Sequence, residues 1–225
     1  MLRDNNDRAE QAIVVFWCVV LVNAVSLLFG FVHLAILDSS GFDTIVNMTA
    51  GLLTLMHLTI LVLSVTYFIR WFRRAYANLE RAGIVIEHEE KWAAGAWFVP
   101  FMNLARPYSI MREIWRDTQL LARDSVQPHT LLNWWWTAFL VKNVVTNISS
   151  RMTSGAETLI ELHSAVIANL FDSSFKIISA LLTIAVIRRV RDFEQQLALR
   201  QQVEAIGAPA PEPVDVGATE EELYY

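Results

Sequence analysis

The sequence predicts an all-α integral membrane protein. We expect a four-helix bundle with a cytoplasmic helical hairpin, re-entrant or interfacial, between the second and third membrane spans. Three observations predict this fold. Hydrophobic residues make up 54% of the 225 residues and the mean hydropathy is +0.36, whereas soluble domains are about 45–50% apolar even with glycine counted. Four long apolar segments interrupt the polar sequence, and the basic residues gather in the stretches beside them.

The four apolar segments are each long enough to cross a hydrocarbon core of about 30 Å. The first has no charged residue and no small-residue cleavage site followed by a polar region, so we expect a retained span and not a signal peptide. The predicted spans are residues 12–37, 45–69, 131–150 and 162–187. We expect the second and fourth spans to continue as helices beyond the membrane, the second as far as a terminating Gly83.

Aromatic residues mark the expected membrane boundaries. Tyr67, Trp71 and Tyr76 follow the second span, and the cluster Trp134–Trp136 opens the third. Tryptophan and tyrosine are enriched at membrane–water interfaces because their rings are amphipathic. We therefore expect these side chains to anchor the spans at the interface.

The segment 92–123 is predicted to be the interfacial hairpin. Its first part, residues 92–105, is almost uncharged but too short to span, and Pro100 interrupts any helix there. A helix is expected to follow from Pro107, with an apolar face and an opposite charged face. The apolar face holds Tyr108, Met111, Ile114, Trp115 and Leu121, and the charged face Arg112, Glu113, Arg116, Asp117 and Arg123. The apolar face suits packing on the protein's own core, and it also suits a helix lying on the membrane surface.

Charge sets the expected topology. The connection between spans two and three and the stretch after span four carry most of the arginine and lysine, whereas the other two connections carry one basic residue between them. Cytoplasmic loops are enriched in basic residues, so both termini are expected in the cytoplasm. The predicted organisation is a cytoplasmic N-terminus (1–11), a membrane domain (12–190), and a cytoplasmic helical extension with an acidic, disordered tail (191–225).

Polar residues recur inside all four predicted spans. Counted from the inner boundary at 1.5 Å per residue, they lie roughly 15–22 Å deep. The residues of this polar layer are Asn23, His57, Lys142, Asn143, Asp172 and Lys176. Asp172 and Lys176 are four residues apart and suited to pair, and Lys142 is a competitor for the same carboxylate. Two interpretations stay open: a packing network that fixes helix register, and a lining for a small aqueous cavity.

Catalytic and cofactor motifs are not found in the sequence. It has no glycine-rich nucleotide loop and no nucleophile elbow. The single Cys18 excludes a multi-thiolate metal site, and Glu87-His88-Glu89-Glu90 lacks the second histidine of a zinc-protease motif. The basic residues border spans, where topology explains them, so they do not indicate nucleic-acid binding. We therefore expect no enzymatic activity, no cofactor and no metal.

Three motifs resemble those of a bacterial membrane-protein family known only as a domain of unknown function, number forty-three twenty-eight. They are WFRRAYANL (71–79), WAAGAWFVPFMNLARPYSIMREIW (92–115) and the tryptophan cluster at 134–136. The resemblance covers roughly residues 12–190 and implies a multi-span domain of the bacterial inner membrane, without an activity or a substrate. The family usually has proline or glycine just before the motif tryptophan, where this sequence has Glu90-Lys91, so the turn into the motif is expected to differ.

The central motif also has a physical interpretation. Its candidate residues are Trp92, Gly95, Trp97, Pro100, Asn103, Arg106, Pro107, Tyr108, Arg112, Glu113 and Trp115. Gly95 permits close helix approach, Asn103 is placed to bond to backbone groups freed by the break, and Arg106 suits a lipid phosphate or the Glu113 carboxylate. Plugging of the inner end of the bundle and simple anchoring at the membrane surface are both consistent with this pattern.

The function expected from the sequence is that of a non-enzymatic scaffold or regulatory membrane partner. Its partners would be the lipid bilayer, anionic lipid headgroups beside the basic residues, and a protein bound through the cytoplasmic segment and tail. The alternative is a channel or transporter for an ion or small solute that uses the polar layer. The sequence leaves the oligomeric state open.

Overall fold

The computed structural model describes residues 2–37, 43–123 and 125–207, and every regular element in these ranges is helical. This confirms the predicted all-α class. The elements are α1 (Asn6–Ile36), α2 (Asp43–Arg81), α3 (Trp92–Gly95), the 3₁₀ turn η1 (Met102–Leu104), α4 (Arg106–Arg123), α5 (Thr130–Ser154) and α6 (Leu159–Gly207). The predicted turn at 38–42 and the predicted disordered tail at 208–225 lie outside the described residues.

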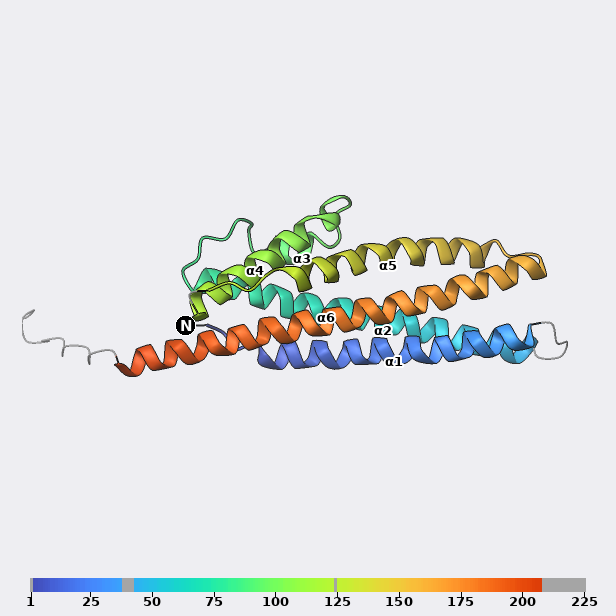
Figure 1. Cartoon of the computed structure of the whole chain (residues 1–225), viewed down its shortest axis with the longest axis horizontal. Coiled ribbons are helices and arrows are strands. Elements are labelled where there is room, and N and C mark those ends of the chain that lie inside the picture. Colours follow the sequence, from blue (N-terminus) through green and yellow to red (C-terminus); the bar gives the residue numbers. More distant parts are fainter. Residues whose placement is uncertain (1, 38–42, 124, 208–225) are drawn as a thin grey trace, which may run out of the picture.

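Four long helices, α1, α2, α5 and α6, run side by side, and the shorter α3 and α4 gather over one end of them (Figure 1). We call this end the cap end. The end of α1, the start of α2 and the connection from α5 to α6 lie at the opposite end, which we call the far end. The N-terminal residues lie at the cap end, where the Asn5 amide donates to the Glu194 carboxylate of α6. The first and last helices therefore have their outer termini at the same end of the molecule.

The long helices form a curved row in the order α2, α1, α6, α5. α6 packs against α1 and α5, and α1 packs against α2, whereas the contact between α2 and α5 is sparse and includes the Phe68 and Trp135 rings. α1 and α6 approach each other closely at Gly30, where an added Cβ would lie 2.6 Å from a methyl carbon of Leu170. The row is thus joined along α1 and α6 and holds a groove between its two edge helices. The four-helix bundle expected from the sequence stays a prediction.

Three helices, α1, α2 and α6, are long and apolar enough to cross a membrane. α5 is not one of them, although its 25 residues amount to about 38 Å of helix. Its mean hydropathy is lowered by Lys142, Asn143 and Asn147 within the helix and by Asn133 and the tryptophans at its start. The span predicted at 131–150 therefore stays a prediction.

The predicted extensions of the second and fourth spans are confirmed, because α2 and α6 continue without a break to Arg81 and Gly207. α2 ends at Gly83, which has a φ of 86°, a left-handed conformation that favours glycine. The Ile84 N–H donates to the Leu79 carbonyl and the Gly83 N–H to the Glu80 carbonyl. These two bonds form the C-terminal cap known as the Schellman motif.

Most of the largest fully buried side chains lie in the cap, which we define as residues 71–123 together with residues 188–207 of α6. Trp71, Tyr76, Ile110 and Val190 are fully buried there. The expectation that Trp71 and Tyr76 anchor the second span at the interface is therefore wrong. Their rings are core residues, because α4 and the end of α6 cover the face of α2 that the sequence left apparently exposed.

α4 packs on this core, mainly against α6 and also against α2 and α5. Met111, Ile114 and Trp115 are buried as their helical spacing predicts. Two residues of the predicted charged face, Glu113 and Asp117, are also buried, which corrects that part of the pattern. The first of the two interpretations of this amphipathic helix, packing on the protein's own core, therefore agrees with the structure.

Candidate functional site

One polar cluster lies between α1 and α2. The Asn23 side chain is only 1% exposed, and its Oδ1 lies 3.3 Å from Nε2 of His57. The Ser26 hydroxyl lies 3.5 Å from the same nitrogen, and the His57 Nδ1 lies 2.8 Å from the Leu53 carbonyl oxygen. These contacts give two predicted members of the polar layer, Asn23 and His57, partners across the two helices.

A second polar cluster lies between α5 and α6. The Asp172 carboxylate is buried and accepts hydrogen bonds of 2.5 Å from both the Lys176 ammonium and the Thr146 hydroxyl. The expected pairing of Asp172 with Lys176 is therefore present. Lys142 does not share this carboxylate, because its Nζ lies over the Phe139 ring, 4.9 Å from the centroid. The structure thus divides the predicted layer into two paired clusters and leaves Lys142 apart from both.

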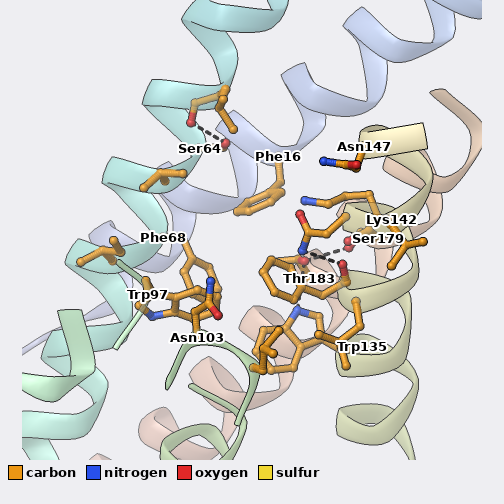
Figure 2. A pocket seen from close by; sticks show the side chains of 18 of the residues that line it. Phe16, Ser64, Phe68, Trp97, Asn103, Trp135, Lys142, Asn147, Ser179 and Thr183 are labelled. Atoms are coloured by element: carbon orange, nitrogen blue, oxygen red, sulfur yellow. Dashed lines mark hydrogen bonds between the residues drawn. The ribbon is translucent and has the colours of Figure 1, made fainter. Parts of the chain in front are cut away.

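Lys142 and Asn143 instead line a groove between α2 and α5, which has a volume of about 690 Å³. α1 and α6 form its floor, and residues 97–104 lie at its cap end. Its aromatic lining residues are Phe16, Phe68, Trp97, Phe98, Trp135 and Phe139, and its polar lining residues are Ser64, Asn103, Lys142, Asn143, Asn147, Ser179 and Thr183. Figure 2 shows Lys142 and Asn147 extending from α5 into the space in front of α2. The groove exists because the helix row is open at this side.

An aromatic cluster holds the cap end of the groove together. The Trp97 ring packs edge-on against Phe68 of α2 and Phe139 of α5, at centroid distances of 5.3 and 5.7 Å. The Trp135 indole donates a 3.1 Å hydrogen bond to the Thr183 hydroxyl of α6. Trp136 is buried beside them, whereas Trp134 is 64% exposed. Of the predicted tryptophan anchors at the start of α5, only Trp134 therefore faces outward.

The motif residues before α4 cover this end of the groove. The Arg106 guanidinium stacks on the Trp92 ring, 4.4 Å from its centroid. Of the two partners considered for Arg106, a lipid phosphate and the Glu113 carboxylate, Glu113 instead bonds to Tyr76 and to the Glu87 backbone. Asn103 lines the groove, and its backbone N–H, not its side chain, bonds to the Val99 carbonyl. A Cβ at Gly95 would make only an ordinary contact with the Trp92 ring, so this glycine does not mark a close helix approach. Pro100 is exposed.

The remaining motif residues tie α4 to its neighbours. The Tyr108 hydroxyl donates to the Asn133 side chain of α5 at 2.5 Å, and the Trp115 indole donates to the Gln127 carbonyl at 3.3 Å. Pro107 is buried in the first turn of α4, whereas Arg112 is exposed. Most of the motif is therefore engaged in packing, and Arg112 is available at the surface.

Glu113 is the buried carboxylate at the centre of the cap. The Tyr76 hydroxyl donates to it at 2.6 Å, and the Glu87 backbone N–H donates at 3.1 Å. Burial raises the pKa of Glu113 above its ordinary value, and it also raises the pKa of Tyr76. This carboxylate joins α2, α4 and the loop between them.

A second carboxylate, Glu194, connects the N-terminus to α2 and α6. It accepts hydrogen bonds from the Asn5 and Asn78 side chains, each at 3.1 Å, and burial raises its pKa to about 7. Sequence reasoning missed this group because Glu194 reads as one charge in a polar helical extension. The buried Asn78 amide beside it gave no separate signal.

The part of the chain that the structure describes holds no group of three or more histidine, cysteine, aspartate or glutamate side chains placed to bind a metal. The profile of one protein family, described as Domain of unknown function (DUF4328), matches residues 39–192. The match starts after α1, later than the resemblance expected from residue 12. The comparisons with curated proteins and with solved structures found no match.

Proposed function

The chain belongs to this family of unknown function, the domain DUF4328, and from its geometry we propose that it is a non-enzymatic membrane scaffold or regulatory partner. In this proposal four helices cross the inner membrane of a bacterium. The cap lies in the cytoplasm and presents a rigid surface to a protein partner. Anionic lipid headgroups lie beside the basic residues around it.

The observation that carries this proposal is the packing of the cap onto helices that leave the apolar region without a break. α2 and α6 supply fully buried side chains such as Trp71, Tyr76 and Val190 to the cap core. Buried hydrogen bonds, such as that from Tyr76 to Glu113, join the cap loop to this core. A dense unit of this kind keeps a fixed position relative to the membrane helices, which suits a scaffold.

The proposed topology rests on the position of the termini and on charge. Asn5 before α1 bonds to Glu194 near the end of α6, which supports an even number of crossings between them. We therefore propose that α5 crosses the membrane in addition to α1, α2 and α6, which are long and apolar enough to do so. The exposed arginines near the cap, such as Arg70, Arg73 and Arg112, favour a cytoplasmic location for this end.

The partner surface is proposed to include the loop between α2 and α3. Val85 in this loop is 95% exposed, and Arg112 is exposed on α4. Both side chains are therefore accessible to a protein partner. The acidic tail, the other proposed docking segment, lies outside the described residues.

Photo-crosslinking tests the scaffold proposal. A photoreactive amino acid would be placed at position 85 or 112 in living cells, with position 160 at the far end as the matched control, because Ile160 is 79% exposed. We expect one discrete crosslinked protein from the cap positions and none from position 160, and we expect Arg112→Glu to remove the product from position 85. Identical products from all three positions would refute a partner surface on the cap.

The alternative function, an ion or solute pathway, is favoured by one observation. The paired clusters of Asn23 with His57 and of Asp172 with Lys176 place ionisable groups within apolar helices, and such groups often mark transport pathways. Flux of protons or small ions into proteoliposomes would be compared between the natural protein, Asp172→Asn and Lys142→Ala. A flux that either variant abolishes would replace the scaffold proposal.

A further inference from the structure

The groove between α2 and α5 has the size and lining of a binding site for part of a lipid-like molecule. Its volume of about 690 Å³ falls within the range of roughly 300–1,000 Å³ that is typical of small-molecule sites. The exposed side chains of Leu61, Val65, Val144 and Ile148 border it, so it is open along the side that faces away from the helix row. A molecule can therefore enter from the surrounding apolar phase.

The charge of the groove is unbalanced. Of the residues that line it, Lys142 is the one charged side chain, and none is acidic. In the described parts of the chain no carboxylate forms an ion pair with Lys142, because the nearby Asp172 is engaged by Lys176 and Thr146. An ammonium group among apolar side chains is costly without a counter-charge. The geometry thus provides a cation without a directly bonded anion.

From this arrangement we propose that the groove binds a single-chain anionic amphiphile, whose acidic group pairs with Lys142 and whose chain lies along the aromatic residues. The ring of Phe139 lies beneath the ammonium group, and Phe16 and Phe68 continue the apolar surface (Figure 2). The Asn147 amide extends into the same space beside Lys142 and supplies a hydrogen-bond donor for the acid. These groups together match a long-chain carboxylate.

The depth of Lys142 selects a compact acid over a phospholipid headgroup. Lys142 lies twelve residues after Thr130, the first residue of α5, which is about 18 Å along the helix axis. A phosphodiester with its polar substituents would have to be drawn far from the membrane surface to reach this point. A carboxylate brings one charge and no further polar group, so it is the better match.

Photoaffinity labelling with a long-chain fatty acid that carries a diazirine tests the proposal. The full-length protein would be labelled in neutral-lipid vesicles, and the methyl ester of the same probe would serve as the uncharged control. We expect the acid to label groove residues and to be displaced by unlabelled fatty acid but not by the matching fatty alcohol. Equal labelling by acid and ester, or equal displacement by both competitors, would show ordinary bilayer contact and overturn the proposal.

Variants separate the charge from the shape of the groove. Lys142→Met keeps an apolar side chain of similar length, and we expect it to reduce labelling by the acid about tenfold, the equivalent of about 1.4 kcal/mol. Lys142→Arg should restore labelling, and the ester should respond to neither variant. Unchanged labelling of Lys142→Met by the acid would overturn the role of this residue.

A second pair of variants fills space without changing charge. Val144→Trp places a large side chain at the mouth of the groove and should reduce labelling by the acid and the ester alike. Leu58→Trp is the matched control, because Leu58 is 59% exposed on α2 and does not line the groove. If Val144→Trp and Leu58→Trp give equal labelling by the acid, the probe binds elsewhere and the proposal is wrong. The competition in the natural protein decides the question even if a variant fails to fold.

Discussion

Polar side chains in the apolar helices are stabilised by hydrogen bonds and ion pairs with their neighbours. The Asp172 carboxylate accepts from Lys176 and from Thr146, which bond to different oxygens of the same group. Breaking a buried ion pair leaves a charge without a partner, whereas replacing both members by apolar residues is often nearly neutral. Removing one member of the Asp172–Lys176 pair should therefore destabilise the protein much more than replacing both members.

We predict that Asp172→Asn lowers the free energy of unfolding by about 3–5 kcal/mol. The reason is that Lys176 would keep its charge in an apolar environment with only a neutral amide beside it. The double variant Asp172→Leu/Lys176→Leu should recover most of the loss. Reversible unfolding in mixed micelles measures both, and a double variant less stable than Asp172→Asn would contradict the prediction.

A second prediction at the residue scale concerns Glu194. Its pKa is raised from an ordinary value of 4.5 to about 7, so the folded chain keeps this proton to a higher pH than the unfolded chain does. The free energy of unfolding should therefore fall as the pH rises from about 4.5 to about 7. Glu194→Gln should flatten the dependence in this window, as measured by the midpoint of thermal unfolding. Glu80→Gln, at an exposed position of α2, is the control and should leave the slope unchanged.

Sequence reasoning at this scale identified polar residues but not all of their partners. The four-residue spacing of Asp172 and Lys176 places both on one helix face, so this pair was predictable. The burial of Glu113 was not, because its donor Tyr76 lies 37 residues earlier on another helix. A helical pattern gives the direction of each side chain, and only the folded chain shows which distant group meets it.

At the scale of elements, α4 shows which of the two interpretations of its amphipathic pattern agrees with the structure. Its apolar face is directed toward α6 and α2, and Ile110 is completely buried there. A helix that lay on a membrane surface would have this face against lipid. Packing on the protein core and packing on a membrane surface therefore predict different losses of stability when a side chain on the apolar face is shortened.

We predict that Ile110→Ala lowers the free energy of unfolding by about 2–5 kcal/mol, because it opens a cavity in the cap core. Leu120→Ala is the matched change on the same helix, where the side chain is 43% exposed, and it should cost less than about 0.5 kcal/mol. Chemical unfolding followed by tryptophan fluorescence measures both. Equal, small effects would show that α4 packs loosely on its neighbours.

The extents of the helices were largely predictable, whereas their grouping was not. α2 and α6 contain no proline, and the end of α2 at Gly83 follows from the freedom of glycine at positive φ. The opening between α2 and α5 depends instead on the aromatic cluster around Trp97, which is inserted between Phe68 and Phe139. The hydrophobic periodicity of α2 and of α5 does not predict that the segment around Trp97 lies between them.

At the scale of the whole molecule, the number of crossings decides where the termini lie, and three helices are long and apolar enough to cross. With four crossings the two termini lie on the same side of the membrane, and with three they lie on opposite sides. The span at 131–150, which corresponds to α5, was predicted from the length of the segment and its tryptophans. Its groove-lining residues Lys142, Asn143 and Asn147 are among those that lower its hydropathy.

We predict that both termini are cytoplasmic and that the far end is external. In a Cys18→Ser background, single cysteines would replace Asp4, Val203 and Ile160, all of which are exposed. A membrane-impermeant thiol reagent should label position 160 in intact cells, and positions 4 and 203 only after permeabilisation. Labelling of positions 4 and 203 from opposite sides would establish three crossings.

The unbroken course of α2 has a mechanical consequence. A continuous α-helix without proline resists sharp bending, so its two halves move together as one lever. The middle of α2, from Leu61 to Ile69, borders the groove, whereas the following turns are held in the cap core by Trp71 and Tyr76. Any widening of the groove that tilts α2 must therefore also turn the loop at Val85. The width of the groove and the orientation of the cap surface consequently change together.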